Sequence, residues 1–312
     1  MARHGIFQYI RLKFLATFFR FMISWRGNTA LLKDLAISDN PRRKLVQIPS
    51  RDAGRFIKAW LYSPPDPTTP QTKKPLLVNW HGSGFIFPSL GKDVVFCSKV
   101  ARETGALVLD ADYSKGPEVP FPGAVHDVED TLKWVASQPE QFDLSRIAVS
   151  GFSAGGNLAL VAASSLRKQL SPLEIPLVIS VYPPTDIAAD AEAKTVPNPI
   201  KPIPAHVATI FNDCYVPEIA LRTDPRVSPI FTDPKLFPPT VAIFTCEGDT
   251  LAPEGIALGQ KLDDGQRKVI NINLKGVHHG FDHGCDPGTN EWEQREYYQK
   301  ISIDTIKEVF GL

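Results

Sequence analysis

Short apolar runs recur along the chain at intervals that suit β-strands, with helical stretches between several of them. Runs rich in β-branched and aliphatic residues predict strands at 76–80, 107–110, 147–150, 177–181, 241–245 and 269–274. Strands that alternate with helices predict a mostly parallel sheet with helices on both faces. We therefore expect an α/β fold with a single core over residues 1–312.

Two regions depart from this alternation. Residues 44–49 and 55–62 are β-rich runs joined by a polar turn, which predicts an antiparallel hairpin at a sheet edge. Between Pro183 and Pro239 frequent prolines exclude long continuous helices. We expect an insertion of short helices there, and its place just after a strand end suits a lid over a site.

The N-terminal segment has a helical pattern of apolar residues from Ile6 to Trp25, with basic residues among them. Such a helix either docks on the body as a lid, which we favour, or lies on a membrane surface through residues 1–26. A cleaved transit peptide fits less well because serines are few. The apolar positions are Ile6, Phe7, Ile10, Phe14, Phe18, Phe21 and Met22, and the basic ones among them Arg11, Lys13 and Arg20.

Charge and cysteine content exclude several classes of protein. Lys plus Arg and Asp plus Glu each number 34, so no net field attracts nucleic acid, although residues 1–44 hold nine basic and two acidic residues. The four cysteines are widely spaced, which favours a reducing compartment such as the cytoplasm, with at most peripheral contact with a membrane there. No uncharged apolar run reaches the 18 residues or so of a spanning helix.

A candidate nucleophile lies where the run 147–150 passes into an Ala- and Leu-rich helical stretch. Gly151-Phe152-Ser153-Ala154-Gly155 has the G-x-S-x-G spacing of a turn that exposes a serine above a parallel sheet. The two chain segments that leave so sharp a turn nearly touch, so the flanking positions require glycine. The pattern predicts that Ser153 is nucleophilic.

A nucleophilic serine needs a base within hydrogen-bond reach and a carboxylate that orients this base. In enzymes with this strand–turn–helix the chain order is serine, then acid, then histidine. The acid is Asp249, or Glu247 in the same turn, after the strand at 241–245. The base follows the strand at 269–274, where His278 and His279 compete and His283 is near; we choose Asp249 and His279.

The oxyanion formed on attack needs backbone N–H donors that are already in place. One is the N–H of Ala154, directly after the serine, and others belong to the loop after an earlier strand. Trp80-His-Gly-Ser-Gly-Phe85 follows the strand at 76–80, and its small residues let N–H groups approach a substrate.

Six motifs in this order resemble the hormone-sensitive-lipase-like branch of the α/β-hydrolases, over about residues 75–281. The segment 81–85, HGSGF, is similar to the HGGGF oxyanion loop of that family, and Gly151 to Gly156 to its GDSAGG elbow. The other four are 112–122 (DYSKGPEVPFP), 224–229 (DPRVSP), 249–255 (DTLAPEG) and 279–281 (HGF).

The resemblance implies an α/β-hydrolase fold and a serine esterase with the triad Ser153, Asp249 and His279, and it selects His279 over His278. It implies oxyanion donors at Ser83, Gly84 and Ala154, with His81 bracing their loop. Two positions depart from the family pattern. Ser83 replaces a glycine and puts a hydroxyl near the acyl pocket, and Phe152 replaces an acid, so we expect Phe85 and Phe152 to line an apolar substrate pocket.

We therefore expect a single α/β-hydrolase domain whose lid consists of residues 1–40 and about 184–225. It would cleave an uncharged carboxylic ester of modest size through an acyl-enzyme, with no metal or organic cofactor. One alternative is a biosynthetic tailoring esterase or acyltransferase on a complex metabolite. The other is a non-catalytic small-molecule receptor on the same fold. The sequence indicates no particular oligomeric state.

Overall fold

A computed structural model describes residues 5–25, 29–38, 42–65 and 73–312, so parts of the predicted lid segment 1–40 lie outside the described residues. One sheet has the strand order β1-β2-β4-β3-β5-β6-β7-β8. All its neighbours from β4 to β8 pair in parallel, which confirms the expected mostly parallel sheet. The strands are β1 (Arg43–Pro49), β2 (Phe56–Tyr62), β3 (Lys74–Trp80), β4 (Leu107–Ala111), β5 (Phe142–Phe152), β6 (Leu177–Val181), β7 (Thr240–Cys246) and β8 (Lys268–Leu274).

The predicted hairpin is present as β1 and β2, which pair antiparallel from Arg43 opposite Tyr62 to Pro49 opposite Phe56. β1 is the edge strand, and β2 continues antiparallel onto β4. Four of the seven residues of β1 are exposed, as expected of a strand at the rim of a sheet.

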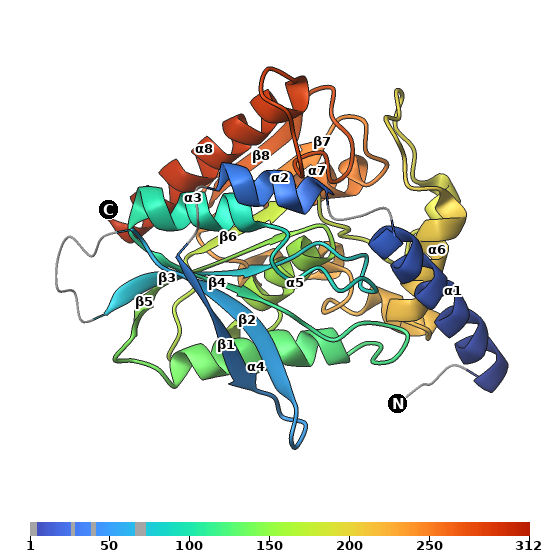
Figure 1. The fold of residues 1–312 in the computed structure, drawn as a ribbon, viewed down its shortest axis with the longest axis horizontal. Coiled ribbons are helices and arrows are strands. Elements are labelled where there is room, and N and C mark those ends of the chain that lie inside the picture. Colours follow the sequence, from blue (N-terminus) through green and yellow to red (C-terminus); the bar gives the residue numbers. More distant parts are fainter. Residues whose placement is uncertain (1–4, 26–28, 39–41, 66–72) are drawn as a thin grey trace.

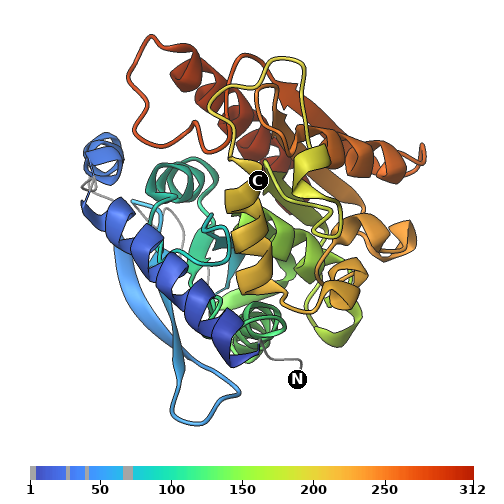
Figure 2. The same ribbon diagram turned by 90° about the vertical axis from the view of Figure 1, so that its right-hand side faces the viewer.

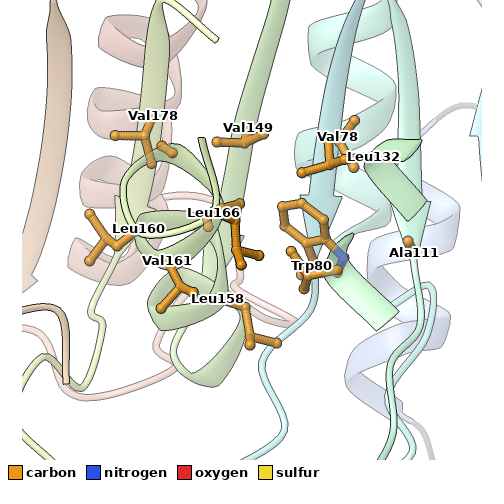
Figure 3. Packing of buried hydrophobic residues seen from close by; sticks show 14 of the residues in the cluster. Val78, Trp80, Ala111, Leu132, Val149, Leu158, Leu160, Val161, Leu166 and Val178 are labelled. Carbon is orange, nitrogen blue, oxygen red and sulfur yellow. The ribbon is translucent and has the colours of Figure 1, made fainter. Parts of the chain in front are cut away.

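Helices cover both faces of the sheet (Figure 1). Successive side chains of a strand point to opposite faces, so Leu76, Val78 and Trp80 of β3 enter one core and Leu77 enters the other. Figure 3 shows the first core, where Trp80 and Val149 pack near Leu158. Over this core lie α4 (Gly123–Ala136), α5 (Ala154–Ala163) and α7 (Ala252–Leu262); over the other lie α2 (Thr29–Ile37), α3 (Val94–Thr104) and α8 (Asn290–Phe310).

The region between β6 and β7 forms short helices, as its prolines predict. α6 (Ala205–Tyr215) is the α-helix among them. The N-terminal helix α1 (Ile6–Trp25) has the predicted bounds and lies alongside α6 in both views (Figures 1 and 2). The 3₁₀ helices are η1 (Arg167–Gln169), before β6, and then η2 (Ala191–Ala193), η3 (Ile219–Thr223), η4 (Pro229–Phe231) and η5 (Pro234–Leu236).

The stripe of α1 that docks on the body is not its most aromatic face. Leu12 and Ala16 are buried against Ile86 and Cys214, whereas Phe7 is 86% exposed and Phe14 70% exposed. Apolar residues occur nearly all round this helix, so their spacing could not identify the contact face. The aromatic face, which we expected a lid helix to bury, is turned outward.

Polar anchors complete the docking of α1. The Arg20 guanidinium donates to the carbonyl oxygens of Ile86 (2.9 Å) and Gly116 (2.8 Å), and it pairs with Glu118. Lys13 pairs with the same carboxylate. Two of the basic residues that suggested membrane attraction therefore serve to hold the helix in place. No helix in the described part of the chain is both long enough and apolar enough to cross a bilayer.

Candidate active site

Ser153 lies at a sharp turn between β5 and α5, where the sequence predicts it. Its φ of 50° is in the left-handed region, which is uncommon for a residue with a side chain. A Cβ at Gly151 would lie 2.2 Å from the carbonyl oxygen of Gly155, and one at Gly155 would lie 1.9 Å from that of Trp80. Both glycines are therefore required by close backbone contact, and they hold the strained serine at the carboxyl end of the sheet.

Ser153 begins an unbroken chain of hydrogen bonds that brings the three predicted residues together. Its Oγ lies 2.8 Å from Nε2 of His279, and Nδ1 of His279 lies 2.6 Å from Oδ2 of Asp249. Asp249 is 2% exposed in the turn after β7, and His279 follows β8. Burial lowers the pKa of His279, but Asp249 outweighs it, so the pKa lies above its ordinary value and the ring accepts a proton readily.

The competing residues have other partners. Glu247 accepts from the Lys275 ammonium and the Gly276 N–H at the surface. His278 contacts the carbonyl oxygen of His279 through Nδ1 (2.8 Å) and Lys201 through Nε2 (3.3 Å). The structure thus places Asp249 and His279, rather than Glu247 and His278, next to Ser153.

The three predicted oxyanion donors line a cavity at Ser153. In the described part of the chain, the N–H groups of Ser83, Gly84 and Ala154 have no hydrogen-bond acceptor, so they are available to a ligand. Gly84 has a φ of +53°, and Ser83 does not share this left-handed conformation, so a serine is tolerated where the related motif has glycine.

His81 braces this loop from beneath, as the resemblance implies. Its ring is fully buried, and Nε2 lies 3.0 Å from Oδ1 of Asp112, which also accepts from Lys115 (2.7 Å). Burial and then Lys115 lower the pKa of His81, which favours the neutral ring. Burial would raise the pKa of Asp112, but His81 and Lys115 hold it far below its ordinary value, so Asp112 stays ionised.

The Ser83 hydroxyl is used within the protein. Its Oγ lies 2.6 Å from the Tyr113 hydroxyl and accepts from the Phe85 N–H (2.9 Å). The Tyr113 hydroxyl donates its one hydrogen to the His81 carbonyl oxygen (2.7 Å), so Ser83 is the donor in the contact between the two hydroxyls. The hydroxyl that we expected at the acyl pocket is therefore hydrogen-bonded to Tyr113 and to the Phe85 N–H within the protein.

The cavity measures about 280 Å³ and is mostly apolar. Phe85 lines it, as predicted, together with Phe211 of α6. Phe152 does not: it is 1% exposed and packs against Phe96 and Tyr182 in the core beneath. The prediction for Phe152 departs from the structure because the turn at Ser153 directs the preceding side chain into the sheet.

Sequence reasoning missed Tyr182, which lies beside His279, and Asp282, which accepts a hydrogen bond from Tyr182. The Tyr182 ring lies 4.8 Å from the His279 ring, and its hydroxyl donates to Oδ1 of Asp282 (2.6 Å). The Tyr298 hydroxyl donates to the other oxygen of Asp282 (2.6 Å). Tyr182 follows β6 directly and Asp282 follows the HGF motif, so their positions after strands were the available signal.

A sequence profile of the α/β-hydrolase fold family matches residues 77–283, a span that contains Ser153, Asp249 and His279. The chain belongs to the α/β-hydrolase family. Within that family its motifs and relatives place it in the hormone-sensitive-lipase-like branch, and the enzyme is a carboxylic ester hydrolase.

Similar proteins of known activity or structure cover most of this α/β-hydrolase. It is 31% identical to esterase LipI of Mycobacterium tuberculosis over 78% of its own length and 76% of that protein. It is 28% identical to an ethyl acetate hydrolase of Pseudomonas putida over 76% and 74% of the two chains. A solved structure of an esterase from Pyrobaculum calidifontis superposes with a TM-score of 0.76 at 28% identity, covering 94% of this chain and 92% of that one.

Proposed function

We propose that this enzyme hydrolyses its ester through an acyl-enzyme on Ser153. The observation that carries the proposal is the chain from Ser153 through His279 to Asp249, with distances of 2.8 Å and 2.6 Å. A hydrogen-bonded nucleophile, base and orienting carboxylate are what acyl transfer to serine requires. A receptor that only binds its ligand needs no such chain, and this favours catalysis.

The geometry supports a two-step reaction. Ser153 Oγ attacks the carbonyl carbon while its proton passes to His279 Nε2, and the carbonyl oxygen becomes an oxyanion within reach of the Ser83, Gly84 and Ala154 N–H groups. The bond to the leaving alcohol then breaks, and His279 returns the proton to that oxygen. Water repeats the sequence on the acyl-enzyme, releasing the acid and free Ser153, while Asp249 holds the imidazolium.

We propose that the insertion and the N-terminal helix form a lid in two layers. Ala208, Phe211 and Asn212 of α6 line the cavity directly. No described residue of α1 does so, but Leu12 and Ala16 of α1 pack beside α6. In this arrangement α6 covers the substrate and α1 fixes α6.

The outward face of α1 supports a further proposal, contact with a membrane surface. Ile6, Phe7, Ile10 and Phe14 are each more than half exposed, and Arg11 lies exposed among them. Exposed apolar groups on one helix face insert at the boundary between headgroups and acyl chains. Since Lys13 and Arg20 pair with Glu118, the attraction rests mainly on apolar burial.

Hydrolysis of nitrophenyl esters of increasing acyl length tests the proposed reaction. The Ser153→Ala variant should fold normally and lose turnover by about a millionfold, because the nucleophile of a serine triad acts with its base as one unit. Circular dichroism and the unfolding temperature establish the fold of the variant. Wild-type turnover in folded Ser153→Ala would refute the assignment.

A further inference from the structure

The ionisable side chains that line the cavity, among the described residues, include bases but no carboxylic acid. Lys92 and Lys194 line it, together with His279 and His283, and none of the described lining residues is an aspartate or glutamate. In an otherwise apolar site, a charge without a partner is costly unless a ligand supplies one. The two lysines differ in whether the protein itself supplies a counter-ion.

Lys194 is already neutralised by the protein. Its ammonium lies 2.5 Å from Oε2 of Glu254 and donates to the carbonyl oxygen of Asp186 (2.6 Å). Lys92, which is half-buried, forms no side-chain hydrogen bond or ion pair with the residues that the structure describes. Burial lowers the pKa of Lys92, and the nearby Asp93 opposes this effect.

Asp93 is a poor counter-ion for Lys92. It is 3% exposed, and one of its oxygens accepts from the Asn79 amide (2.9 Å) while the other has no hydrogen-bond partner among the described residues. Burial and then Asp110 raise its pKa well above the ordinary value, which favours the uncharged acid. Lys92 thus faces the cavity with little compensating negative charge.

The ring of His283 lies between two buried carboxyl groups, and its Nδ1 is 3.9 Å from Oδ2 of Asp34. Nε2 of His283 is 3.9 Å from the unpaired oxygen of Asp93, and His283 lines the cavity together with Lys92 and Ser89. The Lys92 backbone N–H donates to the Ser89 carbonyl oxygen (3.1 Å), so Ser89 and Lys92 belong to one turn of the chain. We call Ser89, Lys92 and His283 the Lys92 corner.

We propose that the Lys92 corner binds a carboxylate of the substrate, so that the preferred esters carry one free carboxylate besides the ester group. This inference rests on the proposed function and replaces the expectation of an uncharged ester. One ammonium balances one negative charge, and a phosphate dianion would leave a second charge uncompensated in the apolar cavity. Hemiesters of dicarboxylic acids are the simplest members of this class.

Binding to the Ser153→Ala variant tests this inference without turnover. Monomethyl glutarate carries a carboxylate and dimethyl glutarate does not, and ligand-observed NMR titration gives a Kd for each. We expect the monoester to bind more tightly, and Lys92→Met to weaken its binding by at least about tenfold, as loss of a charge-assisted hydrogen bond does. Lys168→Met, at an exposed lysine outside the cavity, is the matched control.

The results separate this inference from the proposed reaction. Equal affinity for the two probes, a preference that survives Lys92→Met, or equally tight binding of methyl phosphate would overturn the carboxylate assignment even if the enzyme hydrolyses neutral esters. In the wild-type background, the ratio of kcat/KM for p-nitrophenyl hemiglutarate to that for p-nitrophenyl valerate should fall about tenfold or more with Lys92→Met. A carboxylate preference in binding, without hydrolysis of any ester, would refute the proposed function alone.

Discussion

At the scale of single residues, neighbours in sequence have quite different roles around Ser153. Ser153 faces the cavity at a strained φ, whereas Phe152, one residue earlier, is buried among aromatic rings. His278 and His279 differ in the same way, since only the second reaches Ser153. The direction of each side chain, which the turn sets, decides its role.

The paired histidines give a direct prediction. His279→Ala should lower kcat by about a millionfold, because removing the base of a serine triad costs nearly as much as removing the nucleophile. His278→Ala should keep most of the activity, since it loses only contacts with a backbone carbonyl and Lys201. Steady-state kinetics of the two folded variants on one nitrophenyl ester decides this, and the reverse pattern would make His278 the base.

The sequence predicted the residues of this site that belong to local motifs. Ser153 and Ala154 follow from the elbow. Chain order and strand ends pointed to the turns that hold Asp249 and His279, and the resemblance of residues 279–281 to the HGF motif selected His279 over His278. Tyr182 and Asp282 were missed because they interact only through tertiary contacts, and Lys92 was missed because its place in the cavity wall depends on the fold. Tyr182 and Asp282, for example, are a hundred residues apart and meet only in the folded chain.

At the scale of elements, α1 is held by a few polar contacts as well as by apolar packing. Glu118 pairs with both Lys13 and Arg20, and Leu12 is buried against the body. The spacing of apolar residues predicted the helix and its bounds correctly. It could not predict the docked face, because this depends on where Ile86 and Cys214 present a complementary surface.

Neutralising Glu118 should loosen α1. Burial would raise the pKa of Glu118, but Arg20 and Lys13 lower it from its ordinary value of 4.5 to about 2. The ion pairs of Glu118 therefore stabilise the fold fully above pH 4.5, and this stabilisation is lost as the pH falls towards 2. Glu118→Gln should therefore increase hydrogen exchange over residues 6–25 at neutral pH. The exposed Glu140→Gln is the control, and equal protection of α1 in both variants would contradict the anchoring role.

At the scale of the whole molecule, the α/β-hydrolase core carries two surfaces of different character. The carboxyl ends of the parallel strands and α6 enclose the cavity. α1 lies alongside α6 (Figure 2), and its Phe7 and Phe14 are exposed to solvent. The fold itself was predictable, since buried parallel strands have a recognisable apolar pattern. The docked and the exposed faces of α1 were not predictable, because they depend on tertiary packing.

If the outward face of α1 contacts membranes, polar substitutions on this face should weaken the binding of the protein to vesicles. Phe7→Ser/Phe14→Ser should reduce co-sedimentation with vesicles of phosphatidylcholine and phosphatidylserine, while Leu12 and Ala16 still dock the helix. Binding should change little between low and high salt, since apolar burial dominates. Equal sedimentation of variant and wild type would refute membrane contact, and a concentration-dependent dimer lost in the variant would assign this face to a second copy of the chain.

Covalent labelling by a fluorophosphonate, followed by mass spectrometry, shows whether Ser153 is the activated nucleophile. The reagent phosphonylates a serine only where a base and oxyanion donors activate it. We expect one phosphonyl group per chain, located on the peptide that contains Ser153, and none on Ser153→Ala. An unlabelled wild-type protein that still hydrolyses esters, or a label on a different residue, would show that Ser153 is not the nucleophile.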